Sequence, residues 1–285
     1  MLATRLRETL ALVRFSHTLF ALPFALIGML LAAEGLPAAA TLAWILAAMV
    51  GARTAAMAFN RLVDRHFDAA NPRTAARALP AGRLTAGHAW GVFGAALALL
   101  LLAAWRLNPL TLMLAPLAVV ILCGYSLTKR FTAWTHLVLG LSLSGAPLGA
   151  WIAVRGSVAL PPLLLAGGVL FWTAGFDVIY ALQDVDFDRR ARLHSLPARY
   201  GAVAALHLAR LFHLLAVVFL LATGASAGRG WPYLLGTLLA AALLAYEHVI
   251  VSPDQQARLQ IAFFRVNVAV ALILLGATSI DLLLA

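Results

Sequence analysis

The chain is poor in the residues that a soluble protein of its size usually carries. Only 11% of its 285 residues are charged, whereas 63% are hydrophobic, and its mean hydropathy is +0.93. It contains a single cysteine, Cys123, which excludes an internal disulfide. This composition excludes an ordinary soluble domain and indicates an all-α protein that crosses a membrane several times.

Negative charge is especially scarce. Eleven acidic side chains stand against 21 basic ones, the formal net charge is +10, and the only lysine is Lys129. A basic chain can bind nucleic acid, but no basic soluble segment is present for that purpose, so we expect no nucleic-acid partner. Membrane topology and an anionic ligand explain the excess of arginine better.

Long apolar segments account for most of the chain. Nine of them are long enough to cross a bilayer at about 20 residues per span. They cover residues 15–33, 39–59, 88–105, 109–127, 135–153, 161–180, 203–223, 231–251 and 265–284. The first is too long for the core of a signal peptide, so we interpret it as a retained span.

Basic residues gather on one side of these spans. Sixteen of the 21 lie at the N-terminus and in alternate loops, which predicts that these segments are cytoplasmic. The two longest loops, 60–87 and 181–202, belong to this side, and the C-terminus falls on the other. We therefore expect a multi-pass protein of the cell (inner) membrane. Both long loops carry acids, then arginines, then a Leu-Pro-Ala turn, which suggests a pseudo-repeat of about 1–130 and 131–285 within one domain.

Six of the eleven acids fall in two short segments, in or just before those two loops. Asn60, Asp64 and Asp68 are spaced i, i+4, i+8, so a helix would place them on one face. Asp177, Asp184 and Asp188 are spaced i, i+7, i+11, again one helical face, with Asp186 off it. Oxygen ligands without His or Cys suit Mg²⁺, which usually shares a substrate phosphate. The plainer interpretation is solvated helix ends paired with arginines.

Acidic metal ligands beside many arginines predict a diphosphate as the third component. Mg²⁺ would bridge it to the carboxylates, and basic side chains would neutralise its remaining oxygens. The candidates are Arg65, Arg77, Arg83, Lys129 and Arg130. Apolar helices behind such a site favour a lipid substrate with a charged head, and a polyprenyl diphosphate has that form.

At this point the motifs resemble a known family, the UbiA superfamily of intramembrane aromatic prenyltransferases. The resemblance covers nearly the whole chain, and its opening and its Gln183–Asp188 stretch are similar to the 4-hydroxybenzoate polyprenyltransferase-like branch. The segments that carry it are Arg14–Thr18 with Ala21–Phe24, Asn60-x3-Asp64-x3-Asp68, Arg73–Gly82, Tyr125-x3-Lys129-Arg130 and Asp177-x2-Tyr180-x3-Asp184-x3-Asp188.

The resemblance implies a nine-helix bundle with a central cavity open to the cytoplasm. It implies two Mg²⁺ ions that join Asp64, Asp68, Asp184 and Asp188 to the prenyl diphosphate, with Asn60 assisting. Diphosphate or acceptor contacts are then expected from Arg53, Arg65, Arg77, Tyr125, Lys129, Arg130 and Tyr180. Asp177 or Asp184 would polarise the phenol or accept the ring proton. His17, beside Arg14, is a further substrate-contact candidate.

The implied reaction transfers a polyprenyl group to an aromatic carboxylate, 4-hydroxybenzoate, in quinone biosynthesis (ubiquinone or menaquinone). A dihydroxynaphthoate acceptor is the alternative. Two more distant alternatives are a transporter and another lipid-phosphate enzyme such as a CDP-alcohol phosphotransferase. The dense single Asp/Gly motif of the latter is absent, and transport sites tend to lie near the bilayer midplane rather than at helix ends.

Overall fold

Helices joined by turns and short loops form the described structure. It is a computed structural model that describes residues 8–10, 12, 18–251, 259 and 262–285, and no strand occurs among them. The chain groups into two compact units. Unit 1 contains the described residues within 1–18 and 39–127, and unit 2 contains 19–38 and those within 128–285. Each unit is considered by itself below.

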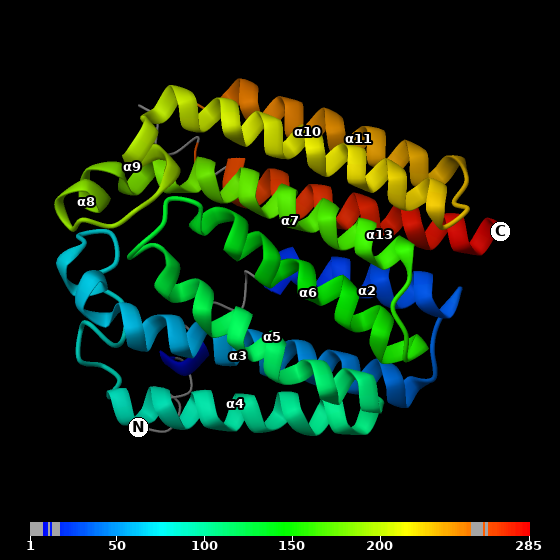
Figure 1. Cartoon of the computed structure of the whole chain (residues 1–285), viewed down its shortest axis with the longest axis horizontal. Helices are drawn as coiled ribbons and strands as arrows, with labels where there is room; N and C mark the ends of the chain where they lie inside the picture. The colour runs from blue at the N-terminus through cyan, green and yellow to red at the C-terminus, as the bar shows by residue number, and fades with distance from the viewer. Residues whose placement is uncertain (1–7, 11, 13–17, 252–258, 260–261) are drawn as a thin grey trace. The chain divides into compact units, whose positions relative to one another are not determined.

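Unit 1 consists of three long helices. They are α3 (Ala39–Ala70), α4 (Ala86–Leu107) and α5 (Pro109–Thr128, whose last residue belongs to unit 2). Thr85 caps α4 by accepting a hydrogen bond from the His88 backbone. Helices α3 and α4 pack side by side (Figure 1). Gly51 permits this approach, because a Cβ there would lie 2.9 Å from the Ala96 carbonyl oxygen.

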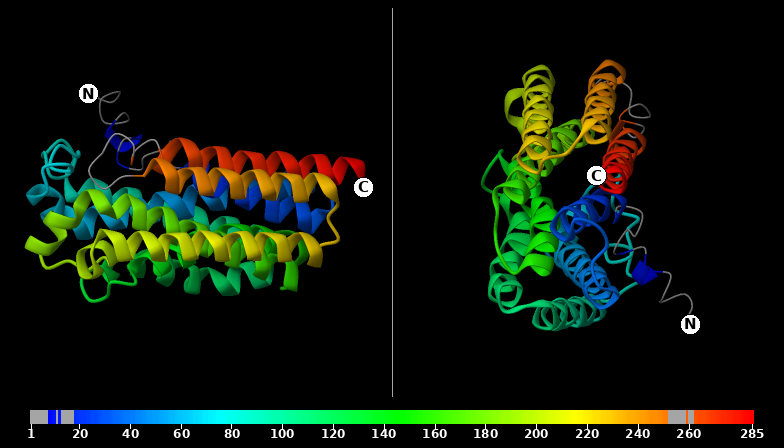
Figure 2. Two further views of the ribbon diagram at one scale, coloured as in Figure 1. Left: turned by 90° about the horizontal axis from the view of Figure 1, so that it is seen from above. Right: turned by 90° about the vertical axis from the view of Figure 1, so that its right-hand side faces the viewer.

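Unit 2 contains α2 (Thr18–Ala33), α6 (Thr135–Arg155), α7 (Leu160–Ala181), α10 (Ala202–Ser226), α11 (Trp231–Ile250) and α13 (Asn267–Leu284). A π-helical turn, Ala262–Val266, precedes α13. Helix α7 packs against both α6 and α10, while α11 packs against α10 and α13, as the end-on view of Figure 2 shows for α10 and α11. Phe20 and Phe24 of α2 contact Trp172 of α7.

Short elements connect α7 to α10. The chain passes from α7 into a 3₁₀ turn (Leu182–Asp184), then α8 (Val185–Arg190), then α9 (Leu196–Tyr200). Figure 1 shows α8 and α9 beyond one end of α7. Ser195 caps α9 through a hydrogen bond from the Ala198 backbone. These short elements make up most of the loop between spans that the sequence predicted at residues 181–202.

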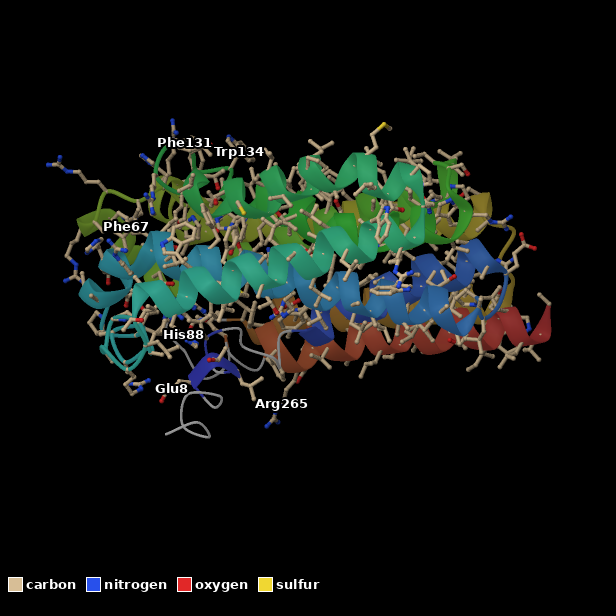
Figure 3. All side chains as sticks on the ribbon, turned by 90° about the horizontal axis from the view of Figure 1, so that it is seen from below. Glu8, Phe67, His88, Phe131, Trp134 and Arg265 are labelled. Carbon is tan, nitrogen blue, oxygen red and sulfur yellow. The ribbon has the colours of Figure 1, made fainter. Side chains whose placement is uncertain are left out.

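The helices confirm the predicted membrane-spanning segments. Eight described helices are long and apolar enough to cross a membrane, and a shorter apolar stretch, Phe20–Ala33, corresponds to the first predicted span. The protein is thus a multi-pass membrane protein. Phe131 and Trp134 lie close together on the turn between α5 and α6, where both are exposed (Figure 3). Exposed aromatic side chains at span ends are typical of a membrane interface.

One predicted boundary is wrong. The sequence placed a loop at 60–87, but α3 continues as a helix to Ala70, about three turns beyond residue 59. The helix continues because residues 55–68 keep a helical pattern of buried positions, namely Ala55, Ala58, Leu62, Asp64 and Asp68. The first acidic motif therefore lies on a rigid helix rather than in a loop.

Candidate active site

The first acidic motif lies on one face of α3, as its spacing predicted. The Asn60 side-chain amide donates to Asp64 Oδ2 at 3.1 Å and to Ser126 Oγ of α5 at 3.3 Å. Asp64 is 2% exposed. Asn60 Oδ1 accepts from Arg61 at 3.4 Å. Asn60 therefore orients the Asp64 carboxylate and joins α3 to α5.

Asp68, one turn further on, is held by arginines. Arg77 Nη1 donates to Asp68 Oδ1 at 2.6 Å, and Arg61 Nη1 lies 3.8 Å from Asp68 Oδ2. Thr74 Oγ1 donates to the Asp68 carbonyl, which fastens the loop that carries Arg77 to the end of α3. Asp68 Oδ2 is buried and has no hydrogen-bond partner among the described residues. An oxygen in that condition is suited to a cation.

A basic pocket of about 270 Å³ lies next to this pair, within unit 1. Its lining combines four arginines with apolar residues: Leu12, Arg61, Arg73, Ala76, Arg77, Ala78, Leu79 and Arg83. Arg83 also donates to Glu8 at 2.9 Å. Such a group of guanidinium side chains favours an anion with several oxygens, of which a diphosphate is one.

The second acidic motif belongs to unit 2 and extends over three successive helical elements. The α-helix ends at Ala181, and the 3₁₀ turn Leu182–Asp184 intervenes before α8. A 3₁₀ turn has fewer residues per turn than an α-helix, so the i, i+7, i+11 spacing no longer fixes one face. The prediction of one face for Asp177, Asp184 and Asp188 assumed one unbroken α-helix, and that assumption is wrong.

Each of these acids has its own surroundings. Asp177 Oδ2 lies 2.7 Å from His136 Nδ1 of α6. Asp188 Oδ2 accepts from Ser195 Oγ at 2.9 Å, and Asp184 and Lys129 lie close enough to influence it electrostatically. The Lys129 carbonyl accepts from the His194 backbone, which joins the Lys129 turn to the segment before α9. Asp186 is exposed, in agreement with its position off the predicted face.

The other residues predicted to contact substrate range from partly buried to exposed. Arg53 and Tyr125 interact electrostatically within unit 1, and both are partly buried. Arg65 is exposed and donates to His66, whereas Asp64 and Asp68 on the same helix are buried. Arg130 is exposed, and the Tyr180 ring stacks on Phe263 with centroids 4.2 Å apart. The motif residues Arg14–His17 lie outside the described residues.

Sequence reasoning missed four residues of these clusters: Arg61, Ser126, His136 and Ser195. Arg61 pairs with Asp68, seven residues away on α3. The Ser-Leu-Pro sequence at Ser195 is a helix N-cap signal and could have been recognised. His136 gave no local signal, because its partner is 41 residues away.

The donor atoms in each unit fit a divalent cation. They are carboxylate and amide oxygens, the type that Mg²⁺ prefers. Within the described part of the chain, neither unit gathers three or more His, Cys, Asp or Glu side chains into a metal site. This fits a cation that takes few protein ligands and completes its coordination with water and substrate oxygens.

Comparison with known families agrees with the motifs. A sequence model of the UbiA prenyltransferase family matches residues 21–269. The 4-hydroxybenzoate octaprenyltransferase of Aeromonas salmonicida is 34% identical over 252 residues, which cover 86% of this chain and 85% of that protein.

Solved structures share the fold. A UbiA homolog from Aeropyrum pernix K1 in its apo form is 34% identical with a TM-score of 0.84, over 93% of this chain and 97% of that one. A UbiA homolog from Archaeoglobus fulgidus bound to DMAPP and Mg²⁺ has a TM-score of 0.71 at 18% identity, over 96% and 99% of the two chains. The second similarity concerns the fold alone.

Proposed function

Since the chain belongs to the UbiA prenyltransferase family, we propose that it transfers a polyprenyl group from a polyprenyl diphosphate to 4-hydroxybenzoate, in quinone biosynthesis. The enzyme class follows from the family. The acceptor is proposed because the relative named above for that activity matches most of this chain. The acidic motifs and the N-terminus are proposed to face the cytoplasm.

The observation that carries the proposal is the Asp68–Arg77 pair beside the basic pocket. A buried carboxylate with one oxygen lacking a hydrogen bond, next to four arginines, supports a ligand that contributes both a cation and phosphate oxygens. A prenyl diphosphate with its metal ions provides both. The apolar tail would then lie among the membrane-spanning helices.

We propose that the first motif (Asn60, Asp64, Asp68) and the second (Asp184, Asp188) each bind Mg²⁺, two ions in all. When bound, Mg²⁺ supplies positive charge to the diphosphate and makes it a better leaving group. Arg77, already aligned by Asp68, contacts diphosphate oxygens, and Lys129 and Tyr180 assist. Arg65 and Arg130, both exposed, remain proposed diphosphate contacts.

The transfer breaks the bond between the allylic carbon and the diphosphate oxygen. A new bond forms between that carbon and a ring carbon ortho to the phenol, and the ring then loses a proton. Asp177 and Asp184 are the two proposed candidates for the proton acceptor. Asp177 Oδ2 accepts a hydrogen bond from His136. Arg53 lies in the spanning part of α3, near Tyr125 of α5. We propose that it holds the carboxylate of the acceptor.

A membrane assay with radiolabelled 4-hydroxybenzoate and a polyprenyl diphosphate, with and without Mg²⁺, tests the proposal. We expect product only with Mg²⁺, and none from Asp64→Ala or Asp184→Ala. Asp186→Ala is the matched control, since this exposed acid lies between the proposed ligands. Product from a dihydroxynaphthoate alone would correct the acceptor, and product from the Asp64→Ala variant would refute the metal site.

A further inference from the structure

His136 is the most constrained polar side chain near the second acidic motif. It is 2% exposed, and both ring nitrogens are hydrogen-bonded. Nε2 receives the backbone N–H of Leu196 at 3.3 Å, and a backbone N–H can only donate. Nε2 must therefore be the unprotonated nitrogen, and Nδ1–H donates to Asp177 at 2.7 Å. The two bonds together require one neutral tautomer.

Leu196, which bonds to Nε2 of His136, begins α9, and the N-cap residue of α9 bonds to Asp188, a proposed metal ligand. Leu196 is the first residue of α9 and is fully buried in an apolar cluster with Val178 and Ile179 of α7. Ser195, just before it, accepts from the Ala198 backbone and donates from its hydroxyl to Asp188 Oδ2 at 2.9 Å. The hydroxyl is thus used in both directions, and its position fixes the orientation of Asp188.

We propose that His136 is a positioning residue that, with Asp177, holds the start of α9 so that Ser195 orients Asp188 toward the metal. The inference rests on the proposed function, because it assigns Asp188 to a cation. Side chains that hydrogen-bond metal-binding carboxylates set their orientation, and their loss typically lowers metal affinity about 10–100-fold. Burial of Leu196 alone anchors α9 but sets no direction for Asp188.

Two substitutions of His136 distinguish the effect of its hydrogen bond to Leu196 from that of its hydrogen bond to Asp177. A glutamine places its amide near the position of Nε2 and can still accept from Leu196, whereas it loses Asp177. An asparagine reaches only the position of Nδ1 and loses Leu196. Since the Leu196 bond controls α9, His136→Gln should retain more metal affinity than His136→Asn. Asp177→Asn keeps an oxygen that can accept from Nδ1, so it should retain most of the affinity too.

The matched control is His213→Asn. His213 is 3% exposed, lies in the same unit, and bonds to His248 rather than to the α9 segment. It thus reports the effect of removing an equally buried histidine. Ser195→Ala is the second variant, and it removes the hydroxyl from Asp188 without altering the core, should His136→Asn fail to fold.

The first measurement is the affinity of the full chain in detergent for Mn²⁺, detected by electron paramagnetic resonance in the presence of inorganic diphosphate. The second is the Mg²⁺ concentration that gives half-maximal prenyl transfer. We expect His136→Asn and Ser195→Ala to weaken Mn²⁺ binding about tenfold or more. His136→Gln should weaken it less, and His213→Asn should leave it unchanged. Wild-type affinity in either of the first two variants would overturn the proposal.

The same series separates this inference from the proposed function. If the wild type binds Mn²⁺ and His136→Asn does not, yet neither forms product from 4-hydroxybenzoate, the positioning role stands and the acceptor is wrong. If Asp188→Ala binds Mn²⁺ as the wild type does, Asp188 is no ligand and the positioning role is refuted. A wild type that binds no Mn²⁺ refutes both.

Discussion

Arg77 donates to Asp68 at 2.6 Å across a loop that returns to the end of α3, so the last acid of the first motif is paired before any ligand arrives. Asp68 keeps its other carboxylate oxygen without a hydrogen bond. The arginine therefore aligns the carboxylate while also lining the basic pocket. One side chain thus connects the proposed cation site to the proposed diphosphate site.

Arg77→Lys should impair use of the prenyl diphosphate. A lysine retains the charge but not the planar fork that can contact Asp68 and a phosphate oxygen together. We expect kcat/KM for the prenyl diphosphate to fall about tenfold, which corresponds to about 1.4 kcal/mol. Arg106→Lys, an exposed arginine at the end of α4, is the control. Equal values for the two variants would show that Arg77 does not touch substrate.

Asn60→Ala should raise the Mg²⁺ requirement. The Asn60 amide bonds to Asp64 Oδ2 and to Ser126, so its loss removes one restraint on the orientation of the Asp64 carboxylate. We expect the Mg²⁺ concentration for half-maximal activity to rise about tenfold. EDTA should abolish the activity of the wild type, and added Mg²⁺ should restore it. Activity that survives EDTA treatment would disprove the dependence on a divalent cation.

Gly140→Val should destabilise unit 2. A Cβ at Gly140 of α6 would collide with the Leu170 carbonyl of α7, a contact between two backbones that side-chain rotation cannot relieve. We expect a loss of about 1–3 kcal/mol, seen as a lower Tm in detergent. Gly145→Ala on the same helix is the control, because nothing lies within 4 Å of its Cβ position. A Tm unchanged in both would indicate that α6 and α7 are further apart.

Substitutions of Glu247 should show how much the buried polar network of unit 2 contributes to stability. Its Oε1 accepts from Asn267, which in turn accepts from Trp172 Nε1. Glu247→Gln keeps an oxygen acceptor and should change stability little. Glu247→Ala should cost about 1–2 kcal/mol through the lost hydrogen bond, measured by thermal unfolding. If the glutamine variant is the less stable of the two, the carboxylate charge rather than its acceptor oxygen is what matters.

The sequence by itself determined the spans and the first acidic face, because hydrophobicity and helical periodicity are local properties. Asn60, Asp64 and Asp68 needed only a helix to align, and α3 supplies it. The Asp177–Asp188 segment could not be predicted in this way. Its helix changes to a 3₁₀ turn at Leu182, and no spacing within the segment reveals that change.

Only the tertiary structure decided which partners hold the acids. His136 meets Asp177 from another helix, 41 residues away, and Arg77 returns to Asp68 over a folded loop. Contacts of this kind depend on how helices pack, and helix packing is set by many side chains at once, such as the glycines that let α3 approach α4 and α6 approach α7. The sequence thus indicated which residues carry the chemistry, while packing determined how each carboxylate is oriented.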